Sequence, residues 1–357
     1  MGGAERMILW LAGALRDRGN YDVRVAALVG GSELCERADE AGLGADHLRF
    51  RGFFDPAGIA RLVRLIRRER IDIVQTHGLR ADAVARWAGR LGGARAIVST
   101  IHSIDPWRRR PHVLLDRVTG PFVSRYVAVC EAAKAASVAR EKIDPARIDV
   151  VPIGIPPRDI PRADAPAIRA RLGVAPHAFC VGILANLRDM KGHRDVVEAL
   201  PAILAGRPDC VFLFAGRDDS GGEIARLARE RGVEGAIRFL GYYRETPELL
   251  AVMDAFMLPS TWEGFPVSIL EALHAGVPVV ASRVGGIPEQ IEDGVDGLLI
   301  EPRSPGQIAE ITLRLAADPG SRERLGAAGA ARAVRDFGLE AMAGRVESVY
   351  GRVLARG

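Results

Sequence analysis

The chain is 357 residues long, and 48% of its residues are hydrophobic and 26% are charged. An ordinary domain has roughly 100–200 residues, so this length predicts two domains, and the composition excludes a chain that is mostly disordered. The four cysteines form no Cys-x-x-Cys pair, which argues against a disulfide scaffold or a structural zinc site and favours a reducing compartment.

The basic excess of the chain lies entirely in its first half. Residues 1–155 hold 25 Lys+Arg and 18 Asp+Glu, a net charge of +7, whereas residues 156–357 hold 24 and 27, a net charge of −3. This asymmetry indicates that one half meets an anionic partner, and a phospholipid surface or a phosphorylated acceptor fits as well as nucleic acid. A solvated basic surface, with arginines enriched by genome composition, is an equal alternative at this point.

No stretch of the sequence reaches the roughly 18 consecutive apolar residues of a membrane span. The apolar run from Met7 to Leu15 follows Arg6 and could be mistaken for the core of a signal peptide. However, Glu5 and the helical spacing that continues to Arg18 predict an amphipathic helix. We therefore expect a cytoplasmic protein, either soluble or peripheral on the inner face of the membrane.

Short β-branched runs alternate with longer stretches of helical period from residue 21 onward. In the first half the pattern predicts strands at 21–28, 71–76, 95–101, 126–130 and 148–152 and helices at 56–70, 80–91 and 131–141. Five prolines between 152 and 166 interrupt both patterns and predict an interdomain linker. This arrangement is typical of a parallel sheet with helices on both faces, in a first domain over 1–155.

A second alternating series follows the linker. It predicts strands at 179–185, 211–215, 236–240, 255–258, 277–282 and 297–300 and helices at 192–205, 222–231, 246–252, 267–275, 305–317 and 321–335. With a second domain over 156–337, the chain is expected to form two facing doubly wound α/β domains, with a ligand cleft at the carboxyl ends of their strands. Residues 338–357 contain a helix at 339–354 with one apolar face, which we expect to pack back toward the first domain.

The start of the chain departs from this pattern. A doubly wound domain opens with a strand, but Gly2-Gly3-Ala4-Glu5 leads directly into the first predicted helix. We therefore expect the first strand of the first domain to be absent, because the start is assigned too late or because the chain is trimmed.

The densest group of candidate functional residues lies between 259 and 273. A strand is predicted to end near Leu258 and a helix to start near Val267, so loop amides and a helix N-terminus favour an anion such as a diphosphate. Glu263 in the loop and Glu271 on the helix lie eight residues apart, and each could accept hydrogen bonds from vicinal hydroxyls of a sugar and a ribose. A capping acid together with a surface loop acid is the structural alternative.

The segment 182–193 also runs from a predicted strand through a loop into a helix. Arg188 and Lys191 in this loop are expected to project over the same cleft. Two cations there would form an electrostatic clamp for a diphosphate leaving group. Solvated loop cations are the alternative for this segment alone.

These motifs together resemble the family 4 retaining glycosyltransferases of the GT-B fold. The resemblance covers almost the whole chain and rests on the opening Gly2-Gly3-Ala4-Glu5-Arg6, the Lys191-Gly192 loop, the Phe239-Leu240-Gly241 strand end, and Glu263-Gly264-Phe265 ahead of Glu271. It implies a nucleotide-diphosphate sugar donor, bound mainly by the second domain, in cell-surface glycan or glycolipid synthesis.

The resemblance also implies roles for residues of the second domain. Glu263 would contact the donor sugar, Glu271 the ribose, and Lys191 the diphosphate. Arg188 would reach the same phosphate from a later position, because the family often places its Arg directly after a Gly, where this chain has Ala185-Asn186. The remaining donor-binding candidates are Gly264, Phe265 and Pro266 in the loop and Gly241 and Tyr242 beside the base.

In the first domain, two histidines lie just past predicted strand ends. The family keeps a comparable His near the donor sugar and acceptor, so the resemblance implies His102 there and His77 as a second candidate, although neither is assigned as a general base. A hydrogen-bonded structural histidine is the alternative. The opening Gly2 and Gly3 are the other candidates on the acceptor side.

A basic cluster with a tryptophan, residues 107–112, precedes the apolar residues 113–115. Arg108 within it is our candidate for contact with an anionic leaflet or a phosphorylated lipid acceptor. A mobile, solvated loop is the competing interpretation.

No two aspartates lie two positions apart, so the chain has no Asp-x-Asp pair to hold a divalent ion on a nucleotide sugar. We therefore expect that no metal ion, and no cofactor beyond the nucleotide-sugar co-substrate, is needed. The resemblance implies a glycosyltransferase that retains the configuration at the anomeric carbon. Its expected partners are that donor, a glycan or lipid-linked acceptor and an anionic membrane surface, without nucleic acid.

Two other functions remain open at this point: a nucleotide-sugar epimerase of the same architecture, and a non-catalytic nucleotide-sugar-binding protein. A nicotinamide oxidoreductase is disfavoured, because no Gly-x-Gly-x-x-Gly follows a predicted strand.

Overall fold

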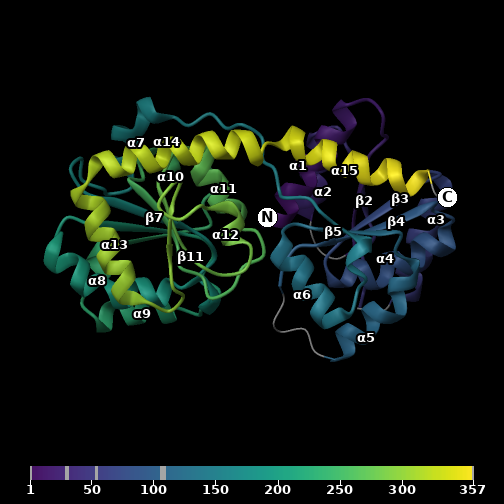
Figure 1. The fold of residues 1–357 in the computed structure, drawn as a ribbon, viewed down its shortest axis with the longest axis horizontal. Helices are drawn as coiled ribbons and strands as arrows, with labels where there is room; N and C mark the ends of the chain where they lie inside the picture. Colours follow the sequence, from purple (N-terminus) through teal and green to yellow (C-terminus); the bar gives the residue numbers. More distant parts are fainter. Residues whose placement is uncertain (1, 29–31, 53–54, 105–109, 356–357) are drawn as a thin grey trace. The chain divides into compact units, whose positions relative to one another are not determined.

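The computed structural model describes residues 2–28, 32–52, 55–104 and 110–355. The chain divides into two compact units: unit 1 consists of Met1–Pro156 and Phe337–Gly357, and unit 2 consists of Pro157–Asp336. Each division lies one residue from the boundary expected from the sequence. Both units are built from parallel strands and helices, which confirms the predicted α/β class (Figure 1).

Unit 2 contains one six-stranded parallel sheet of order β12-β11-β10-β7-β8-β9. Its strands are β7 (Cys180–Leu184), β8 (Val211–Ala215), β9 (Ile237–Gly241), β10 (Ala255–Leu258), β11 (Val279–Ser282) and β12 (Leu298–Ile300). Its helices are α7 (Ala165–Arg171), α8 (His193–Gly206), α9 (Glu223–Glu230), α10 (Thr246–Val252), α11 (Val267–His274), α12 (Ile287–Gln290), α13 (Pro305–Ala317) and α14 (Pro319–Asp336).

The core of unit 2 follows from the near-continuous apolar runs in its central strands. Every residue of β8, β10 and β11 is buried, and Phe212, Phe214 and Phe256 are fully buried. A strand that is apolar on both sides must be covered on both faces of its sheet, and the intervening helices provide that cover. The burial therefore explains why the alternating pattern could be recognised in the sequence.

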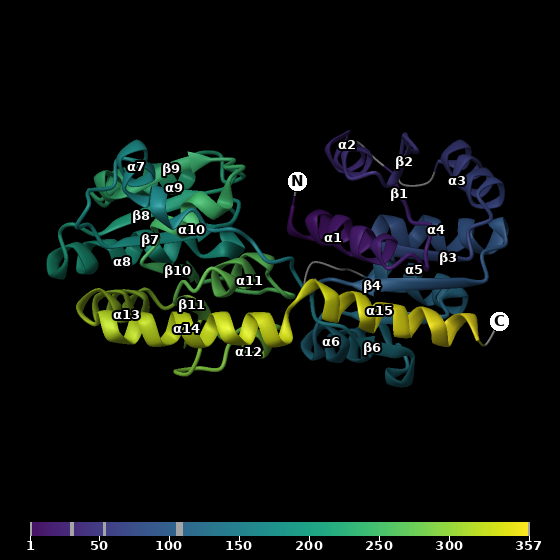
Figure 2. The ribbon, with the colours of Figure 1, turned by 90° about the horizontal axis from the view of Figure 1, so that it is seen from above.

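Unit 1 contains two separate parallel sheets. Within the described residues β1 (Arg24–Ala27) pairs with β2 (Gly44–His47), while β3 (Ile73–His77), β4 (Ala96–Ile101), β5 (Arg125–Ala128) and β6 (Ile148–Val150) form a second sheet in chain order. Figure 2 shows the β1–β2 pair beside α2 and α3, apart from β3 and β4. The helices of unit 1 are α1 (Gly3–Asp17), α2 (Ser32–Glu40), α3 (Pro56–Arg68), α4 (Leu79–Gly92), α5 (Arg110–Thr119), α6 (Glu131–Glu141) and α15 (Leu339–Leu354).

The C-terminal helix α15 belongs to unit 1 and packs against α1 (Figure 1). Its apolar face is buried, as its residue spacing predicts. Arg18 forms ion pairs with Glu340 and Glu347 of α15, and the Tyr350 hydroxyl donates a hydrogen bond to Gln75 on β3. These contacts join the end of the chain to the first part of unit 1.

The structure contains elements that the sequence pattern did not predict. Helices α2, α5 and α12 and strand β2 were missed. Strand β2 (Gly-Ala-Asp-His) has no β-branched residue, and α5 begins within the basic cluster 107–112, for which a loop was the competing interpretation. The linker interpretation of 152–166 was wrong at its end, where α7 starts at Ala165. Pro166 lies in the first turn of α7, where a missing N–H group is tolerated.

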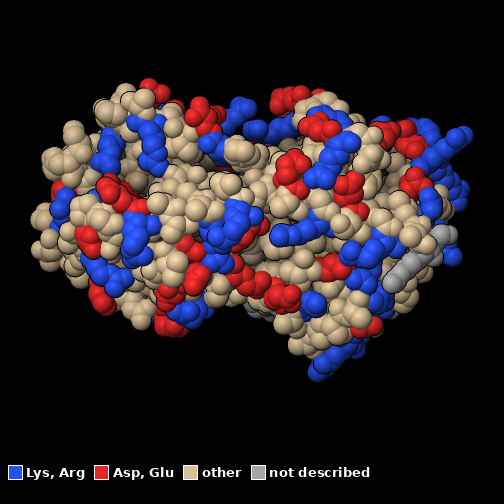
Figure 3. Space-filling model, turned by 45° about the horizontal axis from the view of Figure 1, so that its top comes forward, with Lys and Arg blue, Asp and Glu red and all other residues tan. Residues whose placement is uncertain are grey.

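The surface charge of the described residues is mixed. On the face drawn in Figure 3, basic and acidic side chains lie among one another over both units. Many arginines of unit 1 pair with acids, as Arg24 does with Asp46 and Arg125 with Asp149. Among the described helices, none is long and apolar enough to cross a membrane.

Candidate functional site

The sheet of unit 2 reverses its strand order between β7 and β10. From β7 the chain adds β8 and β9 on one side, and then returns to place β10, β11 and β12 on the other. In parallel sheets a ligand site lies outside the carboxyl ends of the strands at such a reversal, because the loops that follow the two strands diverge there. The loops after β7 and β10 carry the residues selected from the sequence, Lys191 and Glu263.

These two loops approach each other closely. The backbone N–H of Thr261 donates to the carbonyl of Met190 at 2.8 Å. Gly192 has a φ of +73°, and a Cβ at this position would overlap the carbonyl oxygen of Pro259. Only glycine meets both conditions without strain, which gives Lys191-Gly192 a physical reason at this position.

Lys191 and Glu263 contact each other across the two loops. The Lys191 Nζ lies 2.5 Å from Glu263 Oε1, and the Ser260 hydroxyl donates to the same oxygen at 2.7 Å. Glu263 is buried, and these two donors compensate for the water that its carboxylate loses on burial. The site therefore holds a cation and a carboxylate side by side at the reversal.

Glu271 lies on α11 and is fully buried, as its apolar neighbours in the sequence indicated. Its Oε1 is 3.3 Å from Nη1 of Arg158, and that nitrogen also donates to the Thr246 hydroxyl at 3.2 Å. The buried carboxylate is thus paired with a cation from the segment that enters unit 2.

Arg188 contacts a different carboxylate from Lys191. Its Nε donates to Asp219 at 2.7 Å, and this hydrogen bond lowers the pKa of Asp219. Asn186 supports the same turn by donating to Asp219 at 3.3 Å and accepting from the Arg217 backbone N–H at 3.1 Å. The exposed Arg188 guanidinium is therefore held on the loop after β8.

The loop residues Gly264 to Pro266 are attached to the segment after β11. The Gly264 carbonyl accepts from the Gly286 N–H at 3.0 Å, and the Pro266 carbonyl accepts from Gln290 at 3.1 Å. Phe265 is buried. The pair Gly285-Gly286, two residues after the buried strand β11, was a sequence signal for this third loop that we did not use.

Gly241 and Tyr242 lie at the end of β9, two strands from β7. Gly241 has a φ of +62° and its carbonyl accepts from the Gly216 N–H at 2.8 Å. Tyr242 is exposed, whereas the Tyr243 hydroxyl donates to Glu248 at 2.6 Å. The structure thus gives Tyr243 a packing role and leaves Tyr242 accessible to a ligand.

His193, the first residue of α8, is fully buried beside Lys191. Its ring packs edge-on against Phe214 with centroids 4.9 Å apart, and neither ring nitrogen has a hydrogen-bond partner within the part of the chain that the structure describes. Burial, with a further contribution from the charge of Lys191, lowers the pKa of His193 from 6.5 to about 3. His193 therefore stays neutral at neutral pH.

In unit 1 the two candidate histidines meet at the ends of neighbouring strands. The Nδ1 of His77 lies 2.8 Å from the Nε2 of His102, and their ring centroids are 5.1 Å apart. Burial and the adjacent His102 hold the pKa of His77 well below its usual range. The structure thus brings together two residues that the sequence had placed separately.

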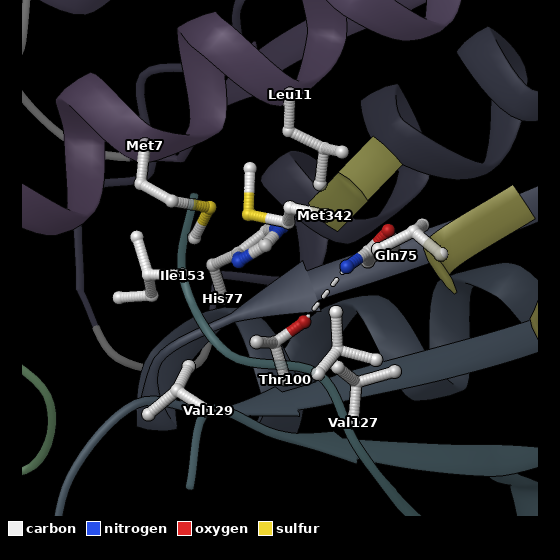
Figure 4. Close-up of a pocket in the computed structure, with 11 residues that line it drawn as sticks. Met7, Leu11, Gln75, His77, Thr100, Val127, Val129, Ile153 and Met342 are labelled. Carbon is white, nitrogen blue, oxygen red and sulfur yellow. Dashed lines mark hydrogen bonds between the residues drawn. The ribbon is translucent and has the colours of Figure 1, made fainter. Parts of the chain in front are cut away.

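A pocket with mainly apolar walls lies beside His77. Met7 and Leu11 of α1 line one side of the pocket, above His77 and Thr100 (Figure 4). Met342 of α15 lies close to Met7 and Leu11. Gly2 is the N-cap of α1 and Gly3 its first residue. They therefore begin the helix that covers this pocket. Arg108 lies outside the described residues.

Several residues that contact the predicted ones were missed in the sequence. Ser260 lay within the motif but was not singled out, and Gln290 and Thr246 had no distinctive spacing. Arg158 follows two prolines in the linker, and nothing in the sequence links it to Glu271.

Comparisons with family models match both halves of the chain. Residues 1–159 match "Glycosyltransferase Family 4", and residues 164–332 match "Glycosyl transferases group 1". The two matches meet close to the division between units 1 and 2.

Individual proteins and one solved structure are also similar to this chain. An Escherichia coli UDP-Gal:alpha-D-GlcNAc-diphosphoundecaprenol alpha-1,3-galactosyltransferase is 27% identical over 69% of this chain and 67% of its own length. A Bacillus anthracis N-acetyl-alpha-D-glucosaminyl L-malate synthase is 26% identical over 84% and 80%. The crystal structure of Anabaena Alr3699/HepE in complex with UDP-glucose superposes with a TM-score of 0.86 at 23% identity, covering 99% of this chain and 96% of that one, and it shows the shared fold.

We predict that His193 makes the folded protein sensitive to acid. Its pKa is depressed in the folded state, so the unfolded state takes up a proton first as the pH falls. The stability contribution is complete above pH 6.5 and is lost between pH 6.5 and about 3, at about 1.4 kcal/mol per pH unit. Urea unfolding between pH 7 and pH 4.5 should show a shallower loss of stability in His193→Phe than in the natural chain.

The matched control is His177→Asn, which changes an exposed histidine of unit 2. We expect its stability to decline with pH as steeply as that of the natural chain. Equal slopes for His193→Phe and the natural chain would refute the assignment.

Proposed function

Because the chain is a GT-B glycosyltransferase, with a family 4 first half and a group 1 second half, we propose that it transfers a sugar from a nucleotide-diphosphate donor to a hydroxyl acceptor. We further propose that the anomeric configuration is retained, that no metal is required, and that the product is a cell-surface glycan or glycolipid. The assignment to glycosyltransferases replaces the epimerase and the binding protein that the sequence left open.

The observation that carries this proposal is the contact between Lys191 and Glu263 at the strand reversal of unit 2. In a nucleotide sugar, the sugar hydroxyls and the diphosphate flank a single anomeric bond. A carboxylate for the hydroxyls and an ammonium for the phosphate must therefore lie close together, as the 2.5 Å contact between these residues provides. The Anabaena structure is described as a complex with UDP-glucose, which is consistent with this kind of donor.

The proposed reaction begins when the bond between the anomeric carbon and the diphosphate oxygen breaks. The electron pair leaves with the diphosphate, which Lys191 and the N-terminal amides of α11 would stabilise, together with Arg188 once it leaves Asp219. The N-cap residue of that helix, Pro266, makes no side-chain capping hydrogen bond. The acceptor oxygen attacks from the same face, which preserves the configuration. Glu271 would hold the ribose hydroxyls throughout.

The acceptor is proposed to be a glycan or a lipid-linked sugar at a membrane surface. The E. coli relative is named for an acceptor linked to diphosphoundecaprenol. On α5 the exposed residues Leu114 and Val118 are 62% and 52% accessible, and the exposed Arg110 and Arg117 lie on the same side by helical spacing. A helix face with apolar and basic residues suits an anionic leaflet.

We predict that Lys191→Ala lowers the turnover number by about 100- to 1000-fold, because a donor aimed at developing charge contributes that much to catalysis. A thermal-shift screen against UDP-, GDP- and ADP-sugars first identifies the donor, since ligand binding to the folded state raises its melting temperature. Release of nucleoside diphosphate from that donor then measures turnover. Lys134→Ala on α6 is the control and should stay at the natural rate; unimpaired turnover in Lys191→Ala would remove Lys191 from the site.

The proposed chemistry also predicts that product forms at the same rate with and without EDTA and carries the donor's anomeric configuration. The cations Lys191 and Arg188 would neutralise the negative charge of the leaving diphosphate, which a divalent ion would otherwise neutralise. Proton NMR of the product reads the configuration in the same reaction. Complete loss of activity in EDTA, restored by Mn²⁺ or Mg²⁺, or an inverted product would contradict the proposal.

Finally, we predict that α5 binds anionic membranes. Replacing Leu114 and Val118 together by Ser should weaken binding to phosphatidylglycerol vesicles by about tenfold or more, because two apolar side chains lose their burial in the leaflet. Co-sedimentation measures the bound fraction. Val334→Ser on α14 removes another exposed valine and serves as the control. An equal loss in both variants, or no binding by the natural chain, would rule out this surface.

A further inference from the structure

Arg158 lies at the start of unit 2 and is attached to two of its helices. It is the second residue of that unit and follows Pro156 and Pro157, which restrict the backbone before it. Its Nη1 is 3.3 Å from Oε1 of Glu271 on α11 and 3.2 Å from the hydroxyl of Thr246 at the start of α10. A single nitrogen thus joins the entering segment to both helices.

The environment of Glu271 requires a cation. Its side chain is 0% exposed, and it stands among the buried residues Ile269, Leu270, Ala272 and Leu273 of α11. An ionised carboxylate in such surroundings is unfavourable unless it is paired and hydrogen-bonded. Arg158 is the cation that the structure places against it, and its own side chain is 21% exposed. The guanidinium therefore reaches from the boundary of the protein interior to the buried acid.

The charge of Glu271 determines which hydrogen bonds it can make. An ionised carboxylate only accepts, and it can accept from two vicinal hydroxyls, whereas a protonated carboxyl carries a donor of its own. An arginine keeps its proton under all ordinary conditions, so it can pair with a carboxylate but cannot accept a hydrogen bond from it. The hydrogen bond to Thr246 fixes the position from which that charge acts.

We propose that Arg158 is a positioning residue for nucleotide recognition: its contacts with Glu271 and Thr246 hold the Glu271 carboxylate oriented to accept hydrogen bonds from the ribose hydroxyls. This inference rests on the proposed function, because it takes the ribose as the partner of Glu271. It assigns to the first residues of unit 2 a part in donor binding that no motif in the sequence marks.

A purely structural role is the alternative, in which the ion pair only holds the entering segment in place. The two roles differ in what the loss of Arg158 changes. A structural role affects stability and the binding of all nucleotides alike. A positioning role affects binding only where the nucleotide has hydroxyls for Glu271 to accept from.

The test compares UDP with 2′,3′-dideoxy-UDP by isothermal titration calorimetry on the full chain. Where GDP or ADP raises the melting temperature more than UDP does, that nucleotide and its dideoxy analogue take their place. The natural chain should prefer the ribonucleotide by about tenfold or more, as expected for hydrogen bonds to a charged acceptor. Arg158→Met should reduce this preference to within about threefold, by weakening the ribonucleotide alone.

Four further variants make the result specific. Glu271→Gln should remove the same preference, and adding Arg158→Met to it should reduce the preference no further, because both changes remove one interaction. Arg158→Lys keeps a charge and should restore part of the preference. Arg169→Met is the matched control: it breaks another partly buried ion pair of unit 2, with Asp254 at 2.8 Å, and should lower the melting temperature while the preference stays unchanged.

An unchanged preference in Arg158→Met would overturn the inference, even if that variant melts at a lower temperature. A natural chain that binds UDP and its dideoxy analogue equally would also overturn it, by removing the ribose from Glu271. A natural chain that binds none of UDP, GDP and ADP would instead contradict the proposed function itself.

Discussion

The reversal of strand order between β7 and β10 is the constraint on which the candidate site depends. These strands are neighbours in the sheet although the chain builds two further strands between them. Their following loops therefore meet, and Lys191 contacts Glu263 across a separation of 72 residues. The contact of Gly192 with Pro259 leaves no room for a side chain at 192. The close packing of these two loops therefore also sets the distance between the Lys191 ammonium and the Glu263 carboxylate.

Electrostatics in the site are balanced within the protein before a donor binds. Glu263 and Glu271 are both buried, and each has a basic partner, Lys191 and Arg158. In our proposal, a diphosphate changes the balance at the first pair only: it would compete for Lys191, and the sugar hydroxyls would then replace the ammonium as donors to Glu263. The second pair keeps its cation in our proposal. One carboxylate therefore exchanges its partner during binding while the other serves as a fixed acceptor.

The sequence could predict those parts of the structure in which local pattern and burial agree. The central strands β8, β10 and β11 of unit 2 are near-continuous apolar runs, and Glu263 and Glu271 belong to one short motif, so both could be recognised. Strand β2 has no apolar pattern, and α2 and β2 lie in the stretch between the predicted strand 21–28 and the predicted helix 56–70, which gave no signal of its own. Arg158 could not be found, because its contact with Glu271 arises only when the chain returns to the sheet. The local spacing of Arg188 and Lys191 suggested one clamp, whereas the structure holds Arg188 on Asp219, a residue of the next loop.

The histidines of unit 1 illustrate how a contact limits chemistry. Since Nδ1 of His77 and Nε2 of His102 are 2.8 Å apart, one nitrogen must donate and the other accept. Loss of solvation, with a smaller contribution from the adjacent His102, holds the pKa of His77 well below its usual range. A group that resists protonation is a poor general base near neutral pH. In the reaction that we propose, the pair would orient hydroxyls by hydrogen bonds. The proton of the attacking hydroxyl would pass to an oxygen of the departing diphosphate, which gains negative charge as the anomeric bond breaks.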